Sequence, residues 1–233
     1  ADLGVLSLIG PRLGDPNVPH ALGCGELPAV STAVALPAGG FVRRMPSESG
    51  QIELDVLVPR AGIPALLDTI GAVGVRRAGV WAYEAHRVAS RRPRLGVDTD
   101  ERTIPQEADW VGRAVHLDKG CYRGQETVSR VHNLGRPPRM LVLLHLDGSA
   151  DRPATGDPLL AGGRQVGRLG TVVDHADLGP IALALVKRGV AAGTELSTGG
   201  EHLVAASIDA DSLPAADVTG AGRYLDERDP RVG

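Results

Sequence analysis

The segment Gly135-Arg-Pro-Pro-Arg139 divides the chain into two parts with different residue patterns. Two consecutive prolines stiffen the backbone and cannot continue a helix, so an element must end before them. The part that follows consists of short β-like runs separated by Gly, Pro and Asp, namely 139–147, 166–174, 181–187 and 202–208. Runs of this length and spacing predict a small C-terminal β-barrel.

The part before the breaker has the pattern of a mixed layer of helices and strands. A buried strand is expected over 3–9, a hairpin over 41–45 and 51–58, and helices over 61–73 and 78–91. This order predicts an α+β fold in which a ferredoxin-like α/β sandwich domain precedes the small C-terminal β-barrel. We expect four regions: a ferredoxin-like middle domain at 1–92, a signature segment at 93–136, the barrel at 137–210 and a poorly ordered tail at 211–233.

Charge and apolar length exclude two classes of partner. The 233 residues include 25 Lys and Arg against 28 Asp and Glu, for a net charge of −3. Without a global basic excess, no direct nucleic-acid partner is expected. The longest apolar run, 140–146, is too short to cross a bilayer, so no membrane partner is expected either. We further expect a monomer.

The two cysteines, Cys24 and Cys121, lie far apart and belong to no zinc-binding pattern. No stably bound metal is therefore expected from this chain alone, and a reducing, cytoplasmic location is the default. Cys24 has no neighbouring cation and is interpreted as structural. One cysteine cannot hold an iron–sulfur cluster, which needs about four ligands, so any cluster chemistry would require shared or transient ligation.

The stretch Lys119-Gly-Cys-Tyr-Arg-Gly-Gln-Glu126 is the most informative in the chain. Its two glycines allow a tight turn, which places Cys121 before a helix expected over 122–133. A thiol near a helix N-terminus, flanked by Lys119 and Arg123, is placed to be nucleophilic or redox-active. Two other interpretations stay open: Cys121 is a small buried residue, or it is a hydrolase nucleophile whose base is His116 or His132.

The residues after Cys121 fit the start of a helix. Gln125 and Glu126 are expected in its first turn, and Glu126 with Arg130 forms a favourable i,i+4 pair. The aromatic residues add a second clue, since four of the six, Trp81, Tyr83, Trp110 and Tyr122, lie between 81 and 122. Aromatic side chains suit a flat heterocycle, and Tyr122 is the one we expect in a site. For Trp81 we expect ordinary packing.

The octapeptide at 119–126 resembles the K-G-C-Y-x-G-Q-E signature of the YgfZ-type folate-binding proteins. These are relatives of the glycine-cleavage T-protein, an aminomethyltransferase, and of the mitochondrial iron–sulfur assembly factor of the same family. Segments 95–107 and 179–188 also resemble the family, and the resemblance covers most of residues 1–208.

The resemblance implies a three-part fold around a central hole that accepts tetrahydrofolate, with the signature segment packing back on the folate-binding core. It implies a role in maintaining iron–sulfur enzymes, including a tRNA-modifying methylthiotransferase, so the partners would be iron–sulfur client or assembly proteins and a small-molecule folate. It also leads us to expect that about one small domain preceding Ala1 is absent. A non-catalytic assembly factor is expected rather than an enzyme.

The site residues follow from the same motif. The catalytic positions would be Cys121, as the reactive thiol, and Lys119. The cofactor-binding positions would be Trp110, Tyr122, Arg123, Gln125, Glu126, Arg130 and Arg136. Arg123, Arg130, Arg136 and Arg139 could meet an anionic glutamyl tail or could be solvated or ion-paired surface arginines.

One departure from the family pattern concerns the pterin. In the T-protein relatives, a glutamate in an R-x-E-A-G pattern contacts the pterin, and the matching position here is Ala89. A methyl group leaves pterin donors unpaired, at a cost of about 1–3 kcal/mol. Ala89 therefore argues against the alternative function, a tetrahydrofolate-dependent aminomethyltransferase, which is a one-carbon transferase.

Overall fold

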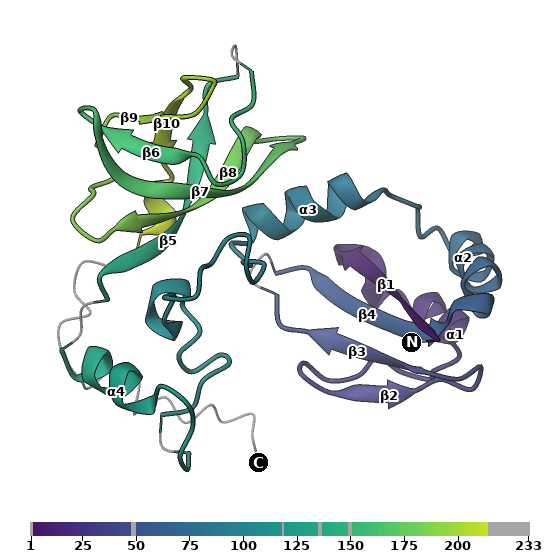
Figure 1. Ribbon diagram of the computed structural model, residues 1–233. Coiled ribbons are helices and arrows are strands. Elements are labelled where there is room, and N and C mark those ends of the chain that lie inside the picture. Colours follow the sequence, from purple (N-terminus) through teal and green to yellow (C-terminus); the bar gives the residue numbers. More distant parts are fainter. Residues whose placement is uncertain (1, 48–49, 118, 135–136, 149–150, 214–233) are drawn as a thin grey trace. The chain divides into compact units, whose positions relative to one another are not determined.

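The computed structural model describes residues 2–47, 50–117, 119–134, 137–148 and 151–213 (Figure 1). The chain divides into two compact units, Ala1–Tyr83 and Glu84–Gly233. The region boundaries expected at 92/93, 136/137 and 210/211 stay predictions. Arg136 and most of the expected tail, residues 214–233, lie outside the described residues.

Unit 1 is a four-stranded antiparallel sheet with two helices. Its elements in chain order are β1 (Leu3–Gly10), α1 (Asn17–Leu22), β2 (Ala33–Ala35), β3 (Phe41–Met45), β4 (Ile52–Pro59) and α2 (Ile63–Ala72). The strand order across the sheet is β1-β4-β3-β2. The strands expected over 3–9, 41–45 and 51–58 and the helix expected over 61–73 are all present.

One face of this sheet packs on the two helices. Leu54, Val56 and Val58 of β4 are buried with Leu22 of α1 and Ile70 of α2, because alternate residues of a strand point to the same side. On β1, by contrast, Leu3 and Val5 are 41% and 57% exposed. Within the described residues, β1 lies at the edge of the sheet and pairs with β4 alone.

The ferredoxin-like detail of the expected fold is not confirmed. The elements β1, α1, β3, β4 and α2 follow a β-α-β-β-α order, and β2 adds a short strand beside β3. A complete ferredoxin-like unit has a further strand after the second helix. In the described part of unit 1, no strand follows α2, so the coarser description, a mixed α+β sheet layer, is what the structure supports.

Unit 2 contains the barrel. Helix α3 (Val80–Ala89) starts at the end of unit 1 and continues into unit 2, and helix α4 (Gln125–Leu134) precedes the first barrel strand. The strands are β5 (Arg139–Leu146), β6 (Pro158–Ala161), β7 (Arg164–His175), β8 (Gly179–Lys187), β9 (Leu196–Thr198) and β10 (Ala205–Ile208). They close into a barrel in the order β10-β5-β8-β7-β6-β9, which confirms the expected C-terminal barrel.

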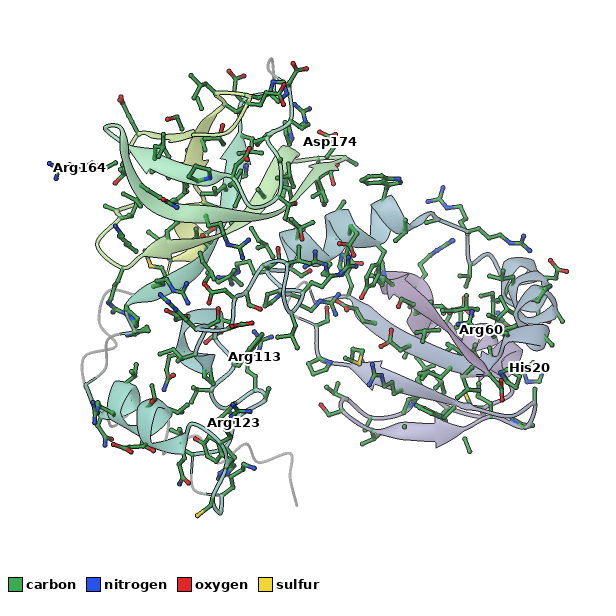
Figure 2. The ribbon with its side chains drawn as sticks, viewed as in Figure 1. His20, Arg60, Arg113, Arg123, Arg164 and Asp174 are labelled. Carbon is green, nitrogen blue, oxygen red and sulfur yellow. The ribbon has the colours of Figure 1, made fainter. Side chains whose placement is uncertain are left out.

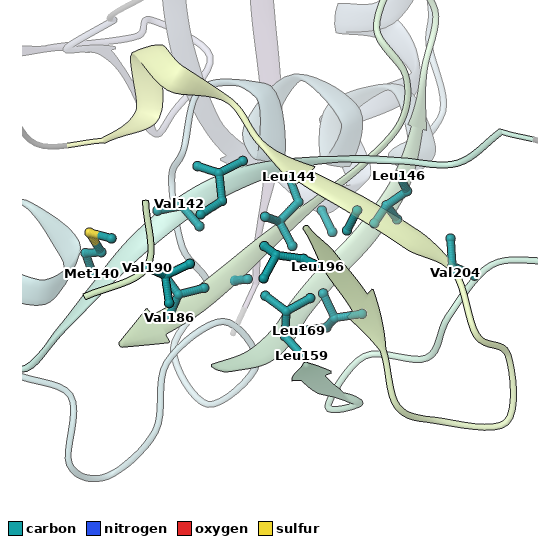
Figure 3. Close-up of a cluster of buried hydrophobic side chains, with 14 residues drawn as sticks. Met140, Val142, Leu144, Leu146, Leu159, Leu169, Val186, Val190, Leu196 and Val204 are labelled. Atoms are coloured by element: carbon teal, nitrogen blue, oxygen red, sulfur yellow. The ribbon is translucent and has the colours of Figure 1, made fainter. Parts of the chain in front are cut away.

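The barrel strands β5 and β8 are apolar on both faces. One face packs in the barrel interior, and the other packs outside the barrel with residues of α3. Val142, Leu144 and Val186 point into the barrel interior (Figure 3). The residues between them, such as Leu143 and Leu183, pack outside the barrel together with Val88 of α3. This double burial explains the continuous apolar run at 140–146, since a strand buried on both faces does not alternate with polar residues.

No helix in the described part of the chain is long and apolar enough to cross a membrane.

Candidate functional site

A buried ionic cluster anchors the polar segment that leads to the signature. Arg87 of α3 donates from Nη2 to Glu84 Oε2 at 2.8 Å and from Nη1 to Asp98 Oδ2 at 2.9 Å. It also reaches Thr171 Oγ1 on β7 at 2.7 Å. Burial alone would lower the pKa of Arg87, but its bonds to Glu84 and Asp98 outweigh burial and raise it. The guanidinium is therefore held charged between helix, loop and barrel.

Asp98 joins this cluster to the barrel backbone. Its Oδ1 accepts from the backbone N–H of Thr171 at 2.6 Å, and its Oδ2 accepts from the backbone N–H of Arg94 at 2.7 Å. The approach is close enough that a Cβ on Gly170 would lie 2.3 Å from Asp98 Oδ1. Residue 170 must therefore lack a side chain, because any Cβ there would collide with the carboxylate.

A second arginine, Arg139 at the start of β5, holds the same segment farther along. It donates from Nη1 to Asp100 Oδ2 at 2.6 Å and from Nη2 to Glu107 Oε2 at 2.8 Å. The bonds to Arg139 lower the pKa of Asp100 well below its usual range, and those to Asp100 and Glu107 raise the pKa of Arg139. The structure thus favours the ion-paired alternative for Arg139 over a free cation for a glutamyl tail.

The segment held by Arg139 contacts helix α4 through Gln106. Gln106 lies in the 3-10 helix Pro105–Ala108, and its Nε2 donates to the backbone carbonyl of Val128 at 2.7 Å. Its other amide atom, Oε1, is buried and has no hydrogen-bond partner among the described residues. No sequence motif marks Gln106 as a site residue, because only the tertiary structure shows that this glutamine is half-buried and hydrogen-bonded to α4.

The octapeptide forms an exposed loop that leads into α4. Cys121 is exposed, which contradicts the interpretation of this residue as small buried filler. Lys119 Nζ lies 5.2 Å from the centroid of the Tyr122 ring, a cation–π contact. Gly124 has φ +83°, a conformation that favours glycine, and a Cβ at Gly120 or Gly124 would meet nothing within 4 Å. The backbone at both glycines that flank the Cys121 loop is therefore unobstructed.

The remaining motif residues are placed as follows. Gln125 and Glu126 occupy the first turn of α4, and Glu126 Oε1 accepts from Arg130 Nη2 at 3.2 Å, as the spacing predicts. Arg123 is exposed and projects from the loop (Figure 2). Trp110 is half-buried, directly after the segment held by Arg139. Tyr122 is half-buried, and its hydroxyl is buried without a hydrogen-bond partner in the described structure.

The other cysteine, one tryptophan and two histidines complete the set of candidate residues. Cys24 is buried in the core of unit 1, where burial raises the pKa of its thiol, in keeping with a structural residue.

Trp81 corrects an expectation, because it is 78% exposed rather than packed. It lies at the start of α3, before the turn whose residues Ala85 and Val88 pack on the barrel. His116 is exposed and His132 is half-buried in α4, and the hydrolase interpretation stays a prediction.

Ala89 supplies no carboxylate, and Glu84, on the same helix, does not substitute for one. Both oxygens of Glu84 are engaged, Oε2 by Arg87 and Oε1 by Arg94. The described residues of α3 thus lack a free carboxylate for a pterin. No group of three or more His, Cys, Asp or Glu side chains that could hold a metal ion occurs among the described residues.

Comparison with known protein families gives a match for the barrel. Residues 139–210 match the C-terminal β-barrel domain of the CAF17 family. An aminomethyltransferase of Moorella thermoacetica is 31% identical over 158 residues, 66% of this chain and 41% of that protein. A putative chloroplastic transferase of Arabidopsis thaliana is 26% identical over 153 residues, 64% of this chain and 34% of that protein.

A solved structure shares the fold. The glycine cleavage system aminomethyltransferase T from Bartonella henselae superposes with a TM-score of 0.63 at 19% identity, over 78% of this chain and 51% of that one. The chain thus spans about half or less of the length of these relatives. Together the matches support a place in the aminomethyltransferase-like superfamily.

Proposed function

We propose that this chain is a folate-binding accessory protein that supports iron–sulfur cluster assembly or repair through the thiol of Cys121. By this route it would support tRNA-modifying iron–sulfur enzymes. The observation that carries the proposal is the exposed thiol of Cys121 in a loop flanked by glycines, with Lys119 and Arg123 exposed on either side. The matching CAF17 barrel domain and the octapeptide signature point in the same direction.

The loop is suited to a thiol that works with a partner. A thiolate is the reactive form of cysteine, and neighbouring cations favour it. Lys119 is oriented by its contact with the Tyr122 ring, so that its ammonium group stays close to the loop. Because one thiolate is a fraction of the ligands that a cluster needs, the partner would supply the others. We propose iron–sulfur client or assembly proteins as those partners, and a monomeric chain in the cytoplasm.

A reduced folate, when bound, supplies a carrier of one-carbon groups. In this chain, Trp110 and Tyr122 would contribute aromatic surface, and Arg123 and Arg130 would attract the glutamyl carboxylates. Gln125 and Glu126, in the first turn of α4, would orient the bound molecule by hydrogen bonds. Arg136 belongs to the same proposed set and lies outside the described residues.

The alternative function, aminomethyl transfer to tetrahydrofolate, is not favoured. The Moorella relative is named an aminomethyltransferase, but this chain spans 41% of it. The pterin-contacting glutamate of the T-protein pattern is replaced by Ala89, and Glu84 is engaged by two arginines. A transferase would have to bind its pterin without that carboxylate.

The test replaces Cys121 by Ser in cells that depend on this gene and measures the activity of a cluster-dependent enzyme, for example methylthiolation of tRNA. We expect the activity to fall to the level of cells without the gene. Cys24→Ala, which removes the buried thiol, is the matched control and is expected to retain activity when the protein level is equal. Full activity of Cys121→Ser at normal protein level would remove the role assigned to the thiol.

A further inference from the structure

The start of helix α3 presents two adjacent apolar side chains to solvent. Val80 and Trp81, its first two residues, are 66% and 78% exposed. The buried apolar residues of this helix, Ala85 and Val88, pack on the barrel strands. A tryptophan buries about 150–250 Å² when it packs, so Trp81 is a large apolar surface that the described fold does not use.

Two arginines close to this pair in the chain or in space carry unpaired charge. Arg76 is exposed and has no hydrogen bond or ion pair with any described residue. Arg12 is exposed and equally unpaired within the described residues. Its Nη2 lies 3.7 Å from the position that a Cβ on Gly74 would take, so Arg12 lies beside the connection between α2 and α3.

The neighbouring carboxylates do not offset these charges. Residues 69–83 contain no aspartate or glutamate. On one side of them, Asp68 is paired with Arg77 at 2.6 Å. On the other side, Glu84 is buried and both of its oxygens are engaged by arginines. The surface around Val80 and Trp81 is therefore positive.

The apolar and the charged side chains are close enough to meet one partner. Arg76 and Trp81 are five residues apart, so their Cα atoms are separated by at most about 18 Å. One side of a standard protein–protein interface covers about 800 Å², which is about 30 Å across. Tryptophan and arginine are also among the residue types that contribute most to binding energy in such interfaces.

We propose that Arg76, Val80 and Trp81, with Arg12 beside the same connection, form a docking surface for a partner protein whose apolar pocket is rimmed by carboxylates. The inference rests on the proposed function, and the partner is the iron–sulfur client enzyme. Trp81 would enter the pocket, and the arginines would pair with the carboxylates.

A membrane and an RNA fit this surface less well. A helix that lies on a bilayer inserts a long apolar face, whereas Ala85 and Val88 of α3 are occupied by the barrel. RNA binding draws its affinity from many phosphate contacts, whereas two unpaired arginines supply few.

The test labels both tryptophans of the full chain with 5-fluorotryptophan and uses a purified tRNA-modifying methylthiotransferase as the probe. The chain has two tryptophans, so the ¹⁹F spectrum contains two signals, and Trp81→Phe assigns them. We expect the enzyme to shift the Trp81 signal and to remove its response to exchange of H₂O for D₂O, because docking excludes water from the ring. A shift of the Trp110 signal alone would overturn the inference.

Variants measured by calorimetry test the same surface. Trp81→Ala is expected to weaken binding of the enzyme about 30-fold or more. Arg76→Glu is expected to weaken it about fivefold and to reduce its dependence on NaCl concentration. Two controls make the same kinds of change on the barrel unit: Leu203→Ala, at a leucine that is 75% exposed, and Arg164→Glu, at an arginine that projects from the barrel (Figure 2). Both are expected to bind like the wild type, and all four to keep the unfolding midpoint.

The outcomes separate this inference from the proposed function. If Trp81→Ala binds the enzyme as tightly as the wild type, the inference is overturned and the proposed function is unaffected. Trp81-dependent binding to phosphatidylglycerol vesicles or to tRNA, with binding of the enzyme unchanged, would overturn it in favour of a membrane or RNA surface. If the wild-type chain does not bind the enzyme, the inference also fails, whereas the role of the thiol is decided independently by Cys121→Ser in cells.

Discussion

Arg87 and Asp98 form a buried ion pair with an Nη1–Oδ2 distance of 2.9 Å, and their side chains are 6% and 0% exposed. The pair joins helix α3 to the polar segment that continues toward Cys121. Asp98 in turn accepts from the backbone N–H of Thr171 in β7. A segment without regular strands or long helices is thus fixed to the barrel by an ion pair and a hydrogen bond at Asp98.

Replacement of Arg87 by Met is expected to destabilise unit 2 strongly. It leaves the carboxylate of Asp98 buried without its cation and leaves Glu84 paired with Arg94 alone, and the loss of a buried partner typically costs about 3–5 kcal/mol. Urea unfolding followed by Trp110 fluorescence in a Trp81→Phe background measures the effect. Arg152→Met, which removes the exposed pair with Asp174, is the control and is expected to cost less than about 1 kcal/mol. Equal losses in the two variants would contradict the importance of burial.

Gly170→Ala tests the close approach of Asp98 to β7. The new Cβ would lie 2.3 Å from Asp98 Oδ1 and 3.1 Å from Asp98 Cα, and Asp98 cannot move without losing its bonds to Arg87 and Thr171. We expect a loss of about 1–3 kcal/mol in the free energy of unfolding, visible as a lower midpoint by calorimetry. Gly189→Ala has open space and is the matched control. A midpoint for Gly170→Ala equal to that of the control would show that the segment is loosely held.

Low pH should weaken the ion pair between Arg139 and Asp100. The pKa of Asp100 is lowered in the folded chain by its bonds to Arg139, whereas in the unfolded chain it is about 3.9. A carboxylate with a depressed folded pKa stabilises the fold above its unfolded pKa and loses this contribution as the pH falls toward the folded value. Stability should therefore fall below about pH 4. Asp100→Asn is expected to reduce the slope of stability against pH between about pH 4 and 2, and an unchanged slope would contradict the assignment.

The two thiols should differ sharply in reactivity. Cys121 is exposed, whereas Cys24 is 6% exposed and burial raises the pKa of its thiol. In the native chain, iodoacetamide is expected to modify Cys121 and to spare Cys24 until denaturant is added. Peptide mass spectrometry of the alkylated protein separates the two sites. Modification of Cys24 at the same rate as Cys121 under native conditions would mean that unit 1 opens readily.

Much of the fold could be predicted from hydrophobic periodicity. The strands β1, β3, β4, β5, β7 and β8 and the helices α2 and α3 coincide with expected segments, because each is long enough to show a period. Helix α1 was missed because its six residues include a proline and leave no stripe. Strand β9 has three residues and is defined by pairing with distant strands, which local sequence cannot show.

The site residues that belong to the octapeptide motif could be predicted from the sequence. Those whose role depends on tertiary contacts could not. The octapeptide indicated the turn before the helix, the first turn of α4 and the pair of Glu126 with Arg130, whereas the exposure of the loop is known only from the structure. Nothing in the sequence shows that Arg87 contacts Thr171, 84 positions away, or that Gln106 donates to the backbone carbonyl of Val128. Trp81 shows the opposite error: an aromatic residue on an apolar helix pattern was expected to pack, but the turn that carries it lies before the part of α3 that contacts the barrel.

The position of β1 has a practical consequence for work with this chain. Edge strands usually resist pairing with other molecules because they contain charged residues or proline. Residues Leu3–Gly10 contain neither. With Leu3 and Val5 exposed, concentrated samples are at risk of sheet-to-sheet aggregation that begins at this strand. Val5→Lys is the simplest safeguard, since Val5 is the more exposed of the two apolar residues and contributes least to the core.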